Sequence, residues 1–268
     1  MNYSDGNYEN CTKIYLNKVF KKYSNIDRLL CEQRCLEKLY HENIFPKILN
    51  VNINQKQIIM TRVNGKIIDR KVAICNLDEL CSAIEKIHAY KSMQSGYLSD
   101  SSSESLKEYL IKKSKVRIDS LKSFIVGTEV IESNVCQNLK NIRFPKTNCL
   151  LHYDLKPSNI LFDSMSNKFK FVDFDRALYG DPLMDYAKLL WRTIGFSPNN
   201  VRDLLKSLTP FYTIDSNFKH RLILYIQLHC IGALSYYVTN KFESYKFIAD
   251  DALRIIKNTI SDGIKVKE

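Results

Sequence analysis

The sequence has no CxxC cysteine pair, no compact run of basic residues and no long, uninterrupted apolar segment. Cys31 and Cys35 lie one helical turn apart with no histidine cluster beside them, so we expect no structural zinc site. The lysines are spread along the chain, so we expect no dedicated nucleic-acid-binding patch. The net charge of +11 nevertheless favours anionic partners, of which nucleotides are one class.

The apolar stretches are too short to indicate a membrane protein. The longest, residues 222–238, is 17 residues long and contains Gln227 and His229. A bilayer span needs roughly 20 apolar residues, so we expect a buried core helix and no membrane span. Residues 1–15 are polar and lack the apolar segment of a secretory signal. We therefore expect a cytoplasmic protein whose eight cysteines are reduced, buried thiols.

The pattern of residues predicts an α+β fold. With 268 residues, 45% apolar and 26% charged, the chain can bury a large core and form two lobes. The first 64 residues predict two strands, a helix over 26–42 and two more strands. Asn64-Gly65 then interrupts the pattern and predicts a hinge. We therefore predict domains at 1–64 and 65–268.

The chain after the hinge is predicted to be mainly helical. Helices are expected over 77–90, twice within 105–141, and again from Asp185 to the C-terminus. A serine-rich stretch at 95–105 predicts an exposed, mobile loop. The window 149–175 is the strand-rich exception. It is also where reactive side chains gather.

Polar side chains follow one another between two short apolar runs in "LHYDLKPSNILF". Asp154 and Asn159 lie in this loop, and Asp173 follows in "FKFVDFD". Strand, loop and strand would bring these oxygen groups together, and such groups suit Mg²⁺ with its bound phosphates. An aspartate that stays off the metal can orient a hydroxyl and accept its proton, which completes a set for phosphoryl transfer. The alternative is a polar loop whose Asp and Asn residues only cap turns.

The same window resembles the catalytic loop of the protein-kinase-like superfamily, H-x-D-x-x-x-x-N followed by a D-F-x motif. "HYDLKPSN", "VDFDRA" and "GDPLMDYAKLL" are most similar to the aminoglycoside phosphotransferase and choline-kinase-like branch. The resemblance implies a bilobal protein-kinase-like fold, with a small, mainly antiparallel-sheet N-lobe carrying one helix and a larger helical C-lobe. It places the catalytic loop at 151–162 and the metal strand at 169–175.

The resemblance implies a role for each polar residue of this region. Asp154 corresponds to the catalytic base, and Lys156 would reach the γ-phosphate. Asn159 and Asp173 correspond to the Mg²⁺ ligands. Asp185 would be buried and would accept backbone N–H bonds that brace the catalytic loop. His152, two residues before Asp154, is expected to pack rather than to act as a base.

The N-lobe of the superfamily holds nucleotide phosphates with a strand lysine paired to a helix glutamate. Lys21 and Glu32 are the candidates here. Val19 and Lys21 point to the same side of a strand, which favours Lys21 over Lys22 if Val19 faces the adenine. Glu37 competes with Glu32 but lies further along the helix. Lys22 therefore stays open as an alternative.

"IIMTRVNG" resembles the hinge of these kinases. By that resemblance Met60 would lie behind the adenine, and Thr61 and Val63 would offer backbone groups to its edge. The alternative is an ordinary core strand. The implied cofactors are ATP or GTP, with Mg²⁺.

The sequence departs from the family pattern at three places. Tyr153 stands where this branch usually has glycine, and Asp175 replaces the glycine of D-F-G. Gly6 is the only glycine before Gly65, so no G-x-G-x-x-G motif lies near the start. The loop that covers the phosphates must then be poor in glycine, or the first strand must be short.

We predict a phosphotransferase that moves the γ-phosphoryl group to a hydroxyl of a small molecule. A protein Ser/Thr kinase is an alternative, but only seven residues separate Asp173 from Asp181, too few for a peptide-binding activation segment. A catalytically weak nucleotide-binding pseudokinase is a second alternative, supported by Asp175 and the glycine-poor start. The acceptor stays open, although the net charge of +11 makes a polycation a less natural partner.

Overall fold

The computed structural model describes residues 10–98, 104–261 and 263–267. An antiparallel sheet with one helix forms the N-terminal part, and the rest of the chain is mainly helical, so the predicted α+β class is confirmed. The chain divides into two compact units, Met1–Ser103 with Lys146–Tyr212, and Glu104–Pro145 with Thr213–Glu268. The predicted domain boundary at residue 64 stays a prediction.

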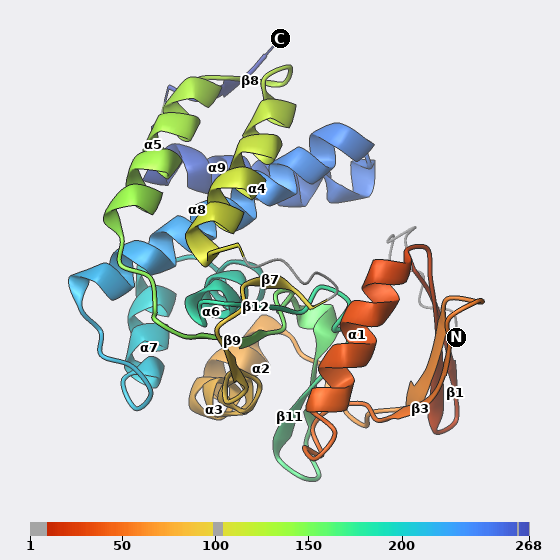
Figure 1. Ribbon diagram of the computed structural model, residues 1–268. Helices are drawn as coiled ribbons and strands as arrows, with labels where there is room; N and C mark the ends of the chain where they lie inside the picture. The colour runs from red at the N-terminus through yellow and green to blue at the C-terminus, as the bar shows by residue number, and fades with distance from the viewer. Residues whose placement is uncertain (1–9, 99–103, 262, 268) are drawn as a thin grey trace. The chain divides into compact units, whose positions relative to one another are not determined.

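The N-terminal sheet of the first unit has four antiparallel strands in the order β1-β2-β4-β3, with α1 alongside (Figure 1). Its elements are β1 (Asn10–Tyr15), β2 (Lys18–Tyr23), α1 (Ile26–Lys38), β3 (Ile48–Asn52) and β4 (Gln57–Thr61). The predicted order of strands and helix is therefore confirmed. A two-residue turn joins β1 to β2 without glycine, and its Leu16 and Asn17 carbonyls accept hydrogen bonds from Arg62.

Helix α1 is shorter than predicted. Asn25 caps its start, because its side-chain oxygen accepts a hydrogen bond from the Asp27 N–H at 2.7 Å. The helix ends at Lys38 rather than at residue 42. The Glu42 N–H donates to the Leu39 carbonyl, which closes a turn where another helical turn was expected. Glu32 lies on the buried face of α1.

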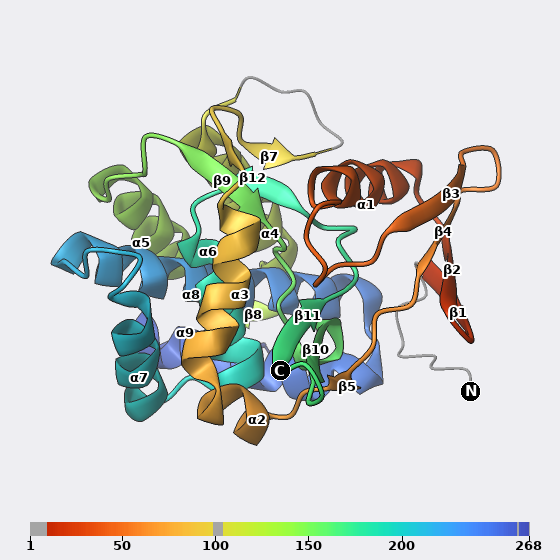
Figure 2. The ribbon, with the colours of Figure 1, turned by 90° about the horizontal axis from the view of Figure 1, so that it is seen from below.

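The remainder of the first unit is built from short strands and helices around residues 148–180. Helix α3 contacts β9 and β11, as Figure 2 shows from below. The elements are β5 (Lys66–Ile67), α2 (Arg70–Cys75), α3 (Leu77–His88), β6 (Lys91–Ser92), β7 (Gly96–Tyr97), β9 (Asn148–Leu151), the 3-10 helix η1 (Pro157–Asn159), β10 (Ile160–Asp163), β11 (Lys168–Phe171), β12 (Leu178–Gly180), α6 (Leu183–Leu189), the π-helical turn η2 (Leu190–Ile194) and α7 (Pro198–Leu208).

Two predictions for this region need correction. The serine-rich segment 95–105 is not exposed at its start, since Ser95 and Leu98 are buried and β7 pairs with β12. Long-range pairing of this kind leaves no local signal in the sequence. Residues 99–103 of that segment lie outside the described residues. The metal strand predicted at 169–175 ends at Phe171, and Asp173 lies in the turn that follows.

The second unit is a helical bundle in which α8 packs against α4 and α9, and α4 packs against α5. Its elements are α4 (Leu106–Leu121), β8 (Ile125–Val126), α5 (Thr128–Asn141), α8 (Ser216–Asn240), the 3-10 helix η3 (Glu243–Tyr245), α9 (Lys246–Thr259) and β13 (Lys265–Val266). Helix α8 is long and apolar enough to span a membrane, but 61% of its most apolar window is buried inside the protein. That burial agrees with the predicted core helix.

Candidate active site

The predicted catalytic loop connects β9 to β10 and is held by a carboxylate from α6. Asp185 is fully buried, and its two oxygens accept the His152 N–H at 2.9 Å and the Tyr153 N–H at 2.6 Å. His88 from α3 reaches the same carboxylate through Nε2 at 3.1 Å. The prediction that Asp185 is buried and braces the loop backbone is confirmed.

Tyr153 adopts a left-handed backbone conformation, with φ of 65°. A residue with a Cβ atom has a cost of roughly 1–2 kcal/mol there, which explains why glycine is usual at this position. The Asp185 bond to the Tyr153 N–H holds the conformation in place. The tyrosine ring is buried and meets the edge of Tyr97. Local strain in this loop is thus offset by buried contacts.

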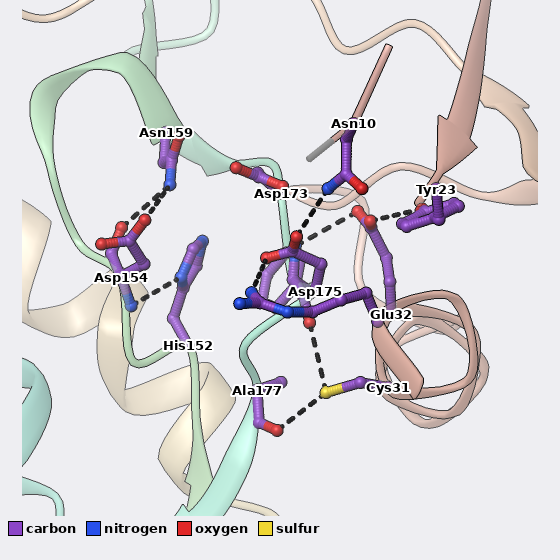
Figure 3. Close-up of polar contacts among 12 residues, drawn as sticks. Asn10, Tyr23, Cys31, Glu32, His152, Asp154, Asn159, Asp173, Asp175 and Ala177 are labelled. Atoms are coloured by element: carbon purple, nitrogen blue, oxygen red, sulfur yellow. Dashed lines mark hydrogen bonds and ion pairs between the residues drawn. The ribbon is translucent and has the colours of Figure 1, made fainter. Parts of the chain in front are cut away.

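His152 supports the loop and does not face solvent. Its Nε2 donates to the Val172 carbonyl at 2.9 Å. Its Nδ1 accepts the Asp154 N–H at 3.3 Å (Figure 3). These two contacts assign the proton to Nε2. The ring also packs against Phe171 and Phe174. The contacts agree with the predicted packing role.

Asp154 lies at the centre of a group of cations. Lys188 Nζ is 3.0 Å from one carboxylate oxygen, and Lys156 Nζ is 3.5 Å from the other. Asn159 donates through Nδ2 to the Asp154 carbonyl at 2.9 Å and to its carboxylate at 3.3 Å. Burial acts to raise the pKa of Asp154, but Lys188, Lys156 and Arg176 outweigh it and hold that pKa well below its usual value.

Lys188 was missed by the sequence reasoning, although a signal exists. It lies three residues after Asp185 on α6, so both side chains project from one helix face toward the catalytic loop. Burial lowers the pKa of Lys188 and the Asp154 charge only partly opposes this effect. The π-helical turn η2 follows directly, and its Thr193 hydroxyl donates to the Leu155 carbonyl at 3.0 Å. Helix and loop are therefore tied together at the site.

A second ionic group joins the N-terminal sheet to the turn after β11. Lys21 on β2 pairs with Glu32 on α1 at 2.5 Å and also with the Asp173 carboxylate. Glu32 further accepts the Tyr23 hydroxyl at 2.5 Å and the Phe174 N–H at 3.1 Å. Burial lowers the pKa of Lys21, but the two carboxylates outweigh it and raise that pKa well above its usual value. Tyr23 was also missed, although the alternation of β2 places it on the Lys21 face.

The competing candidates for this group lie elsewhere. Lys22 is exposed on the opposite face of β2, and Glu37 is exposed on α1 beside Gln33. The structure therefore brings Lys21 and Glu32 together and leaves Lys22 and Glu37 apart from them. Their roles toward a nucleotide remain predictions.

The turn after β11 carries both Asp173 and Asp175. Asp173 has φ of 71°. Burial acts to raise the pKa of Asp173, but Lys21 outweighs it and lowers that pKa. Asp175 is buried, accepts Asn10 Nδ2 at 2.7 Å and lies 3.4 Å from Arg28 (Figure 3). Burial and the nearby Asp173 raise the pKa of Asp175 to about 6. Asp175, which replaces the usual glycine, therefore contacts both β1 and α1.

The predicted hinge lies at the end of β4. Met60 is buried opposite Val19 in the β2–β4 register. The Thr61 N–H donates to the Lys47 carbonyl at 2.8 Å, so the carbonyl is the backbone group of Thr61 left as a candidate for an adenine. Val63 follows the strand and is half-buried. The contact of Met60, Thr61 and Val63 with a nucleotide stays a prediction.

The oxygen groups at this site fit the predicted Mg²⁺. Asn159 uses its amide nitrogen toward Asp154, and its Oδ1, which accepts the Ser158 hydroxyl at 3.3 Å, has a second lone pair for a cation. The Asp173 carboxylate supplies a second hard oxygen, and Asp173 and Asp154 are near enough for each charge to affect the other. Two protein oxygens with phosphate oxygens and waters are the usual environment of Mg²⁺. Asn159 and Asp173 are therefore suitable ligands.

Comparison with known proteins places this geometry in a family. The model of the phosphotransferase enzyme family matches residues 15–212. A choline/ethanolamine kinase family protein from Mesorhizobium loti is 15% identical, with a TM-score of 0.71 over 95% of this chain and 86% of that one. Choline kinase LicA from Streptococcus pneumoniae is 14% identical, with a TM-score of 0.71 over 93% and 90%. Aminoglycoside phosphotransferase APH(4)-Ia is 13% identical, with a TM-score of 0.71 over 96% and 92%.

At these identities the solved structures show a shared fold, and the family match covers most of the chain. The predicted resemblance to the aminoglycoside phosphotransferase and choline-kinase-like branch is confirmed, as is the prediction of a phosphotransferase. The chain belongs to the phosphotransferase enzyme family.

Proposed function

We propose that this protein transfers the γ-phosphoryl group of ATP or GTP to a hydroxyl group of a small molecule. The observation that carries the proposal is the loop braced by Asp185, which presents Asp154 and Asn159 in one short segment. Asp173 in the turn after β11 lies within range of the Asp154 charge and pairs with Lys21. Protein-kinase-like enzymes use such groups to position and neutralise phosphates.

Relatives with solved structures support a nucleotide and a small acceptor. One similar structure is a gentamicin complex of APH(2")-IIa, and another is a GDP complex of aminoglycoside 2'-phosphotransferase-IIIa. We infer that this chain likewise takes a nucleotide, with its adenine or guanine on the hinge formed by Met60, Thr61 and Val63. The eight cysteines are free, which fits a cytoplasmic protein where thiols stay reduced, although Cys11 and Cys75 are exposed and not buried as expected.

Each residue of the site has a proposed task. Lys21, fixed by Glu32, holds the α- and β-phosphates, and Lys156 contacts the γ-phosphate. Asn159 and Asp173 hold Mg²⁺, which supplies neutralisation of phosphate charge when bound. Asp154 orients the acceptor hydroxyl and accepts its proton as the new phosphorus–oxygen bond forms.

The short chain segment between Asp173 and Asp181 supports a small acceptor rather than a peptide. The residues from Phe174 to Ala177 form a tight turn, closed by the Ala177 N–H bond to the Phe174 carbonyl at 3.0 Å. The chain then enters β12 directly. No protein-kinase activation segment fits in this space.

The direct test is phosphoryl transfer from labelled ATP and GTP to water and to a panel of hydroxyl compounds. Asp154→Ala should lower turnover at least ~100-fold, the usual range for loss of a general base, while nucleotide affinity stays near that of the wild type. Asp203→Ala, an exposed carboxylate on α7, is the matched control and should not change turnover. Wild-type turnover in Asp154→Ala would exclude the proposed base.

A further inference from the structure

Two cations near Asp154 have no task in the proposed binding of the nucleotide. Lys188 on α6 and Arg192 on η2 both lie over the ring of Trp191, at 5.6 Å and 5.3 Å from its centre. We call these three residues the Trp191 cluster. Trp191 itself is 3% exposed, whereas Lys188 and Arg192 are half-buried. Two positive charges therefore lie against one aromatic ring.

The charges of the cluster are not balanced within the described chain. The carboxylate paired with Lys188 is Asp154, at 3.0 Å. No carboxylate of the described residues lies within ion-pair distance of Arg192. Asp154 also faces Lys156 and the charge of Arg176. One carboxylate thus stands among several cations, and a bound anion would correct the imbalance.

Lys188 and Asp154 restrain one another through their ion pair. An aspartate accepts a proton from a hydroxyl more readily when its oxygens are not paired with cations. Lys188 occupies one Asp154 oxygen, and Asn159 and Lys156 approach the other. A group that draws Lys188 away would free that oxygen. An anion carried by the acceptor can do this at the moment when the base is needed.

Cationic acceptors fit the cluster poorly. A bound ammonium group is often recognised by the face of an aromatic ring. The Trp191 ring already carries the cations of Lys188 and Arg192, so an incoming ammonium would meet like charges. Neutral acceptors would leave Lys188 on Asp154. The arrangement favours an acceptor with negative charge.

We propose that the acceptor is a hydroxyl compound carrying a phosphate or carboxylate group close to the reacting hydroxyl, and that Lys188 and Arg192 bind this anionic group. The inference rests on the proposed function and names its substrate class. In the reaction the bond between the γ-phosphorus and the leaving nucleotide oxygen breaks, and a bond from that phosphorus to the acceptor oxygen forms. The hydroxyl proton moves to Asp154, and the nucleoside diphosphate leaves with its bridging oxygen.

The test compares acceptors that share a carbon frame and differ in charge. One set is glycerol, glycerate, glycerol phosphate and aminopropanediol, and a second is glucose, gluconate, a glucose phosphate and glucosamine. Thermal midpoints are measured with Mg²⁺ and, in turn, non-hydrolysable analogues of ATP and of GTP, so that the γ-phosphate position is filled. Anionic members should raise the midpoint above that of the neutral member. Carboxylate and phosphate arms show which anion is preferred.

Variants assign the effect to the cluster. Arg192→Met should abolish the added midpoint shift from the anionic compounds. Lys168→Met, an exposed lysine on β11 with the same change of charge, should retain the shift. In turnover, the ratio of kcat/KM for anionic over neutral members should be at least about tenfold in the wild type and should approach one in Arg192→Met.

The outcomes separate this inference from the proposed function. If neutral or amine members shift the midpoint as much as the anionic ones, or if no anionic member shifts it in either set, the inference is wrong. The melt with Mg²⁺ and analogue alone is read first. A shift there without any preference for anions leaves the kinase standing and removes only the anionic acceptor, whereas its absence counts against the kinase itself.

Discussion

The two ionic groups of the site have opposite balances of charge. Around Lys21, one ammonium faces the carboxylates of Glu32 and Asp173. Around Asp154, one carboxylate faces Lys188 and Lys156. The first group carries an excess of negative charge and the second an excess of positive charge. A divalent cation is therefore suited to the first group, and phosphate or another anion to the second.

The groups also differ in how fully their polar atoms are buried and hydrogen-bonded. Glu32 is fully buried, and its two oxygens are used by Lys21, Tyr23 and Phe174. Asp154 is paired with two lysines, whose side chains are long and partly exposed. A closed group fixes a geometry, whereas an open group can exchange partners when substrates bind. This difference supports the proposal that the Lys21 group is a fixed support and that the Asp154 group is the reacting centre.

The largest expected effect on stability comes from removing the ammonium group of Lys21. Lys21→Met leaves Glu32 and Asp173 without their cation, and breaking a buried pair costs about 3–5 kcal/mol in the free energy of unfolding. Denaturant unfolding measures this change. Lys22→Met, the same substitution on the exposed face of β2, should change the free energy by less than about 0.5 kcal/mol. Equal effects of the two substitutions would contradict the assignment of Lys21.

The open group should tolerate loss of a cation. Lys188→Met replaces a half-buried lysine with an apolar side chain of similar length, and Lys156 still faces Asp154. We expect the free energy of unfolding to change by about 1 kcal/mol or less, or even to rise, because removal also relieves a desolvation cost. The same unfolding curves measure it. A loss as large as that of Lys21→Met would end the contrast between the two groups.

The smallest expected effect is a pH dependence from His88. Burial lowers the pKa of His88, but bonds to Asp185 and Glu85 outweigh it and raise that pKa above the usual value. The charged imidazole stabilises the folded state fully below the unfolded pKa of about 6.5, and this contribution is lost as pH rises through the higher folded pKa. The thermal midpoint should therefore fall across this range.

His88→Gln is the control for that slope. It removes the titrating group but keeps a hydrogen-bonding side chain, so the difference in midpoint between wild type and variant should shrink as pH rises. A difference that is constant with pH would show that His88 is not charged in the folded protein. Loss of the His88 charge should lower the midpoint measurably, because Asp185 is fully buried. Its other hydrogen bonds come from the backbone N–H groups of His152 and Tyr153.

The sequence was sufficient for the parts of the site that lie close together along the chain. Asp154, Lys156 and Asn159 share one loop, and the spacing to Asp173 is short, so their assembly could be predicted. The strand order before residue 64 followed from alternation and turns. These features depend on local geometry, which sequence periodicity encodes.

The parts that were missed depend on contacts between distant segments. The pairing of Lys188 with Asp154 spans 34 positions, and only the helix spacing from Asp185 hints at it. Strand β7 is buried because it pairs with β12, and no local pattern in a serine-rich stretch predicts that. The length of α1 was overestimated because the turn closed at Glu42 depends on backbone bonds rather than on apolar spacing.

The central claim is that Asp173 serves the metal and nucleotide whereas Asp154 serves the acceptor. The most direct test is the thermal midpoint with ATP and with GTP, each with and without Mg²⁺, for wild type, Asp173→Asn and Asp154→Asn. We predict a Mg²⁺-dependent shift in the wild type and in Asp154→Asn, and its loss in Asp173→Asn. A full shift in Asp173→Asn, or none in the wild type, would contradict the account.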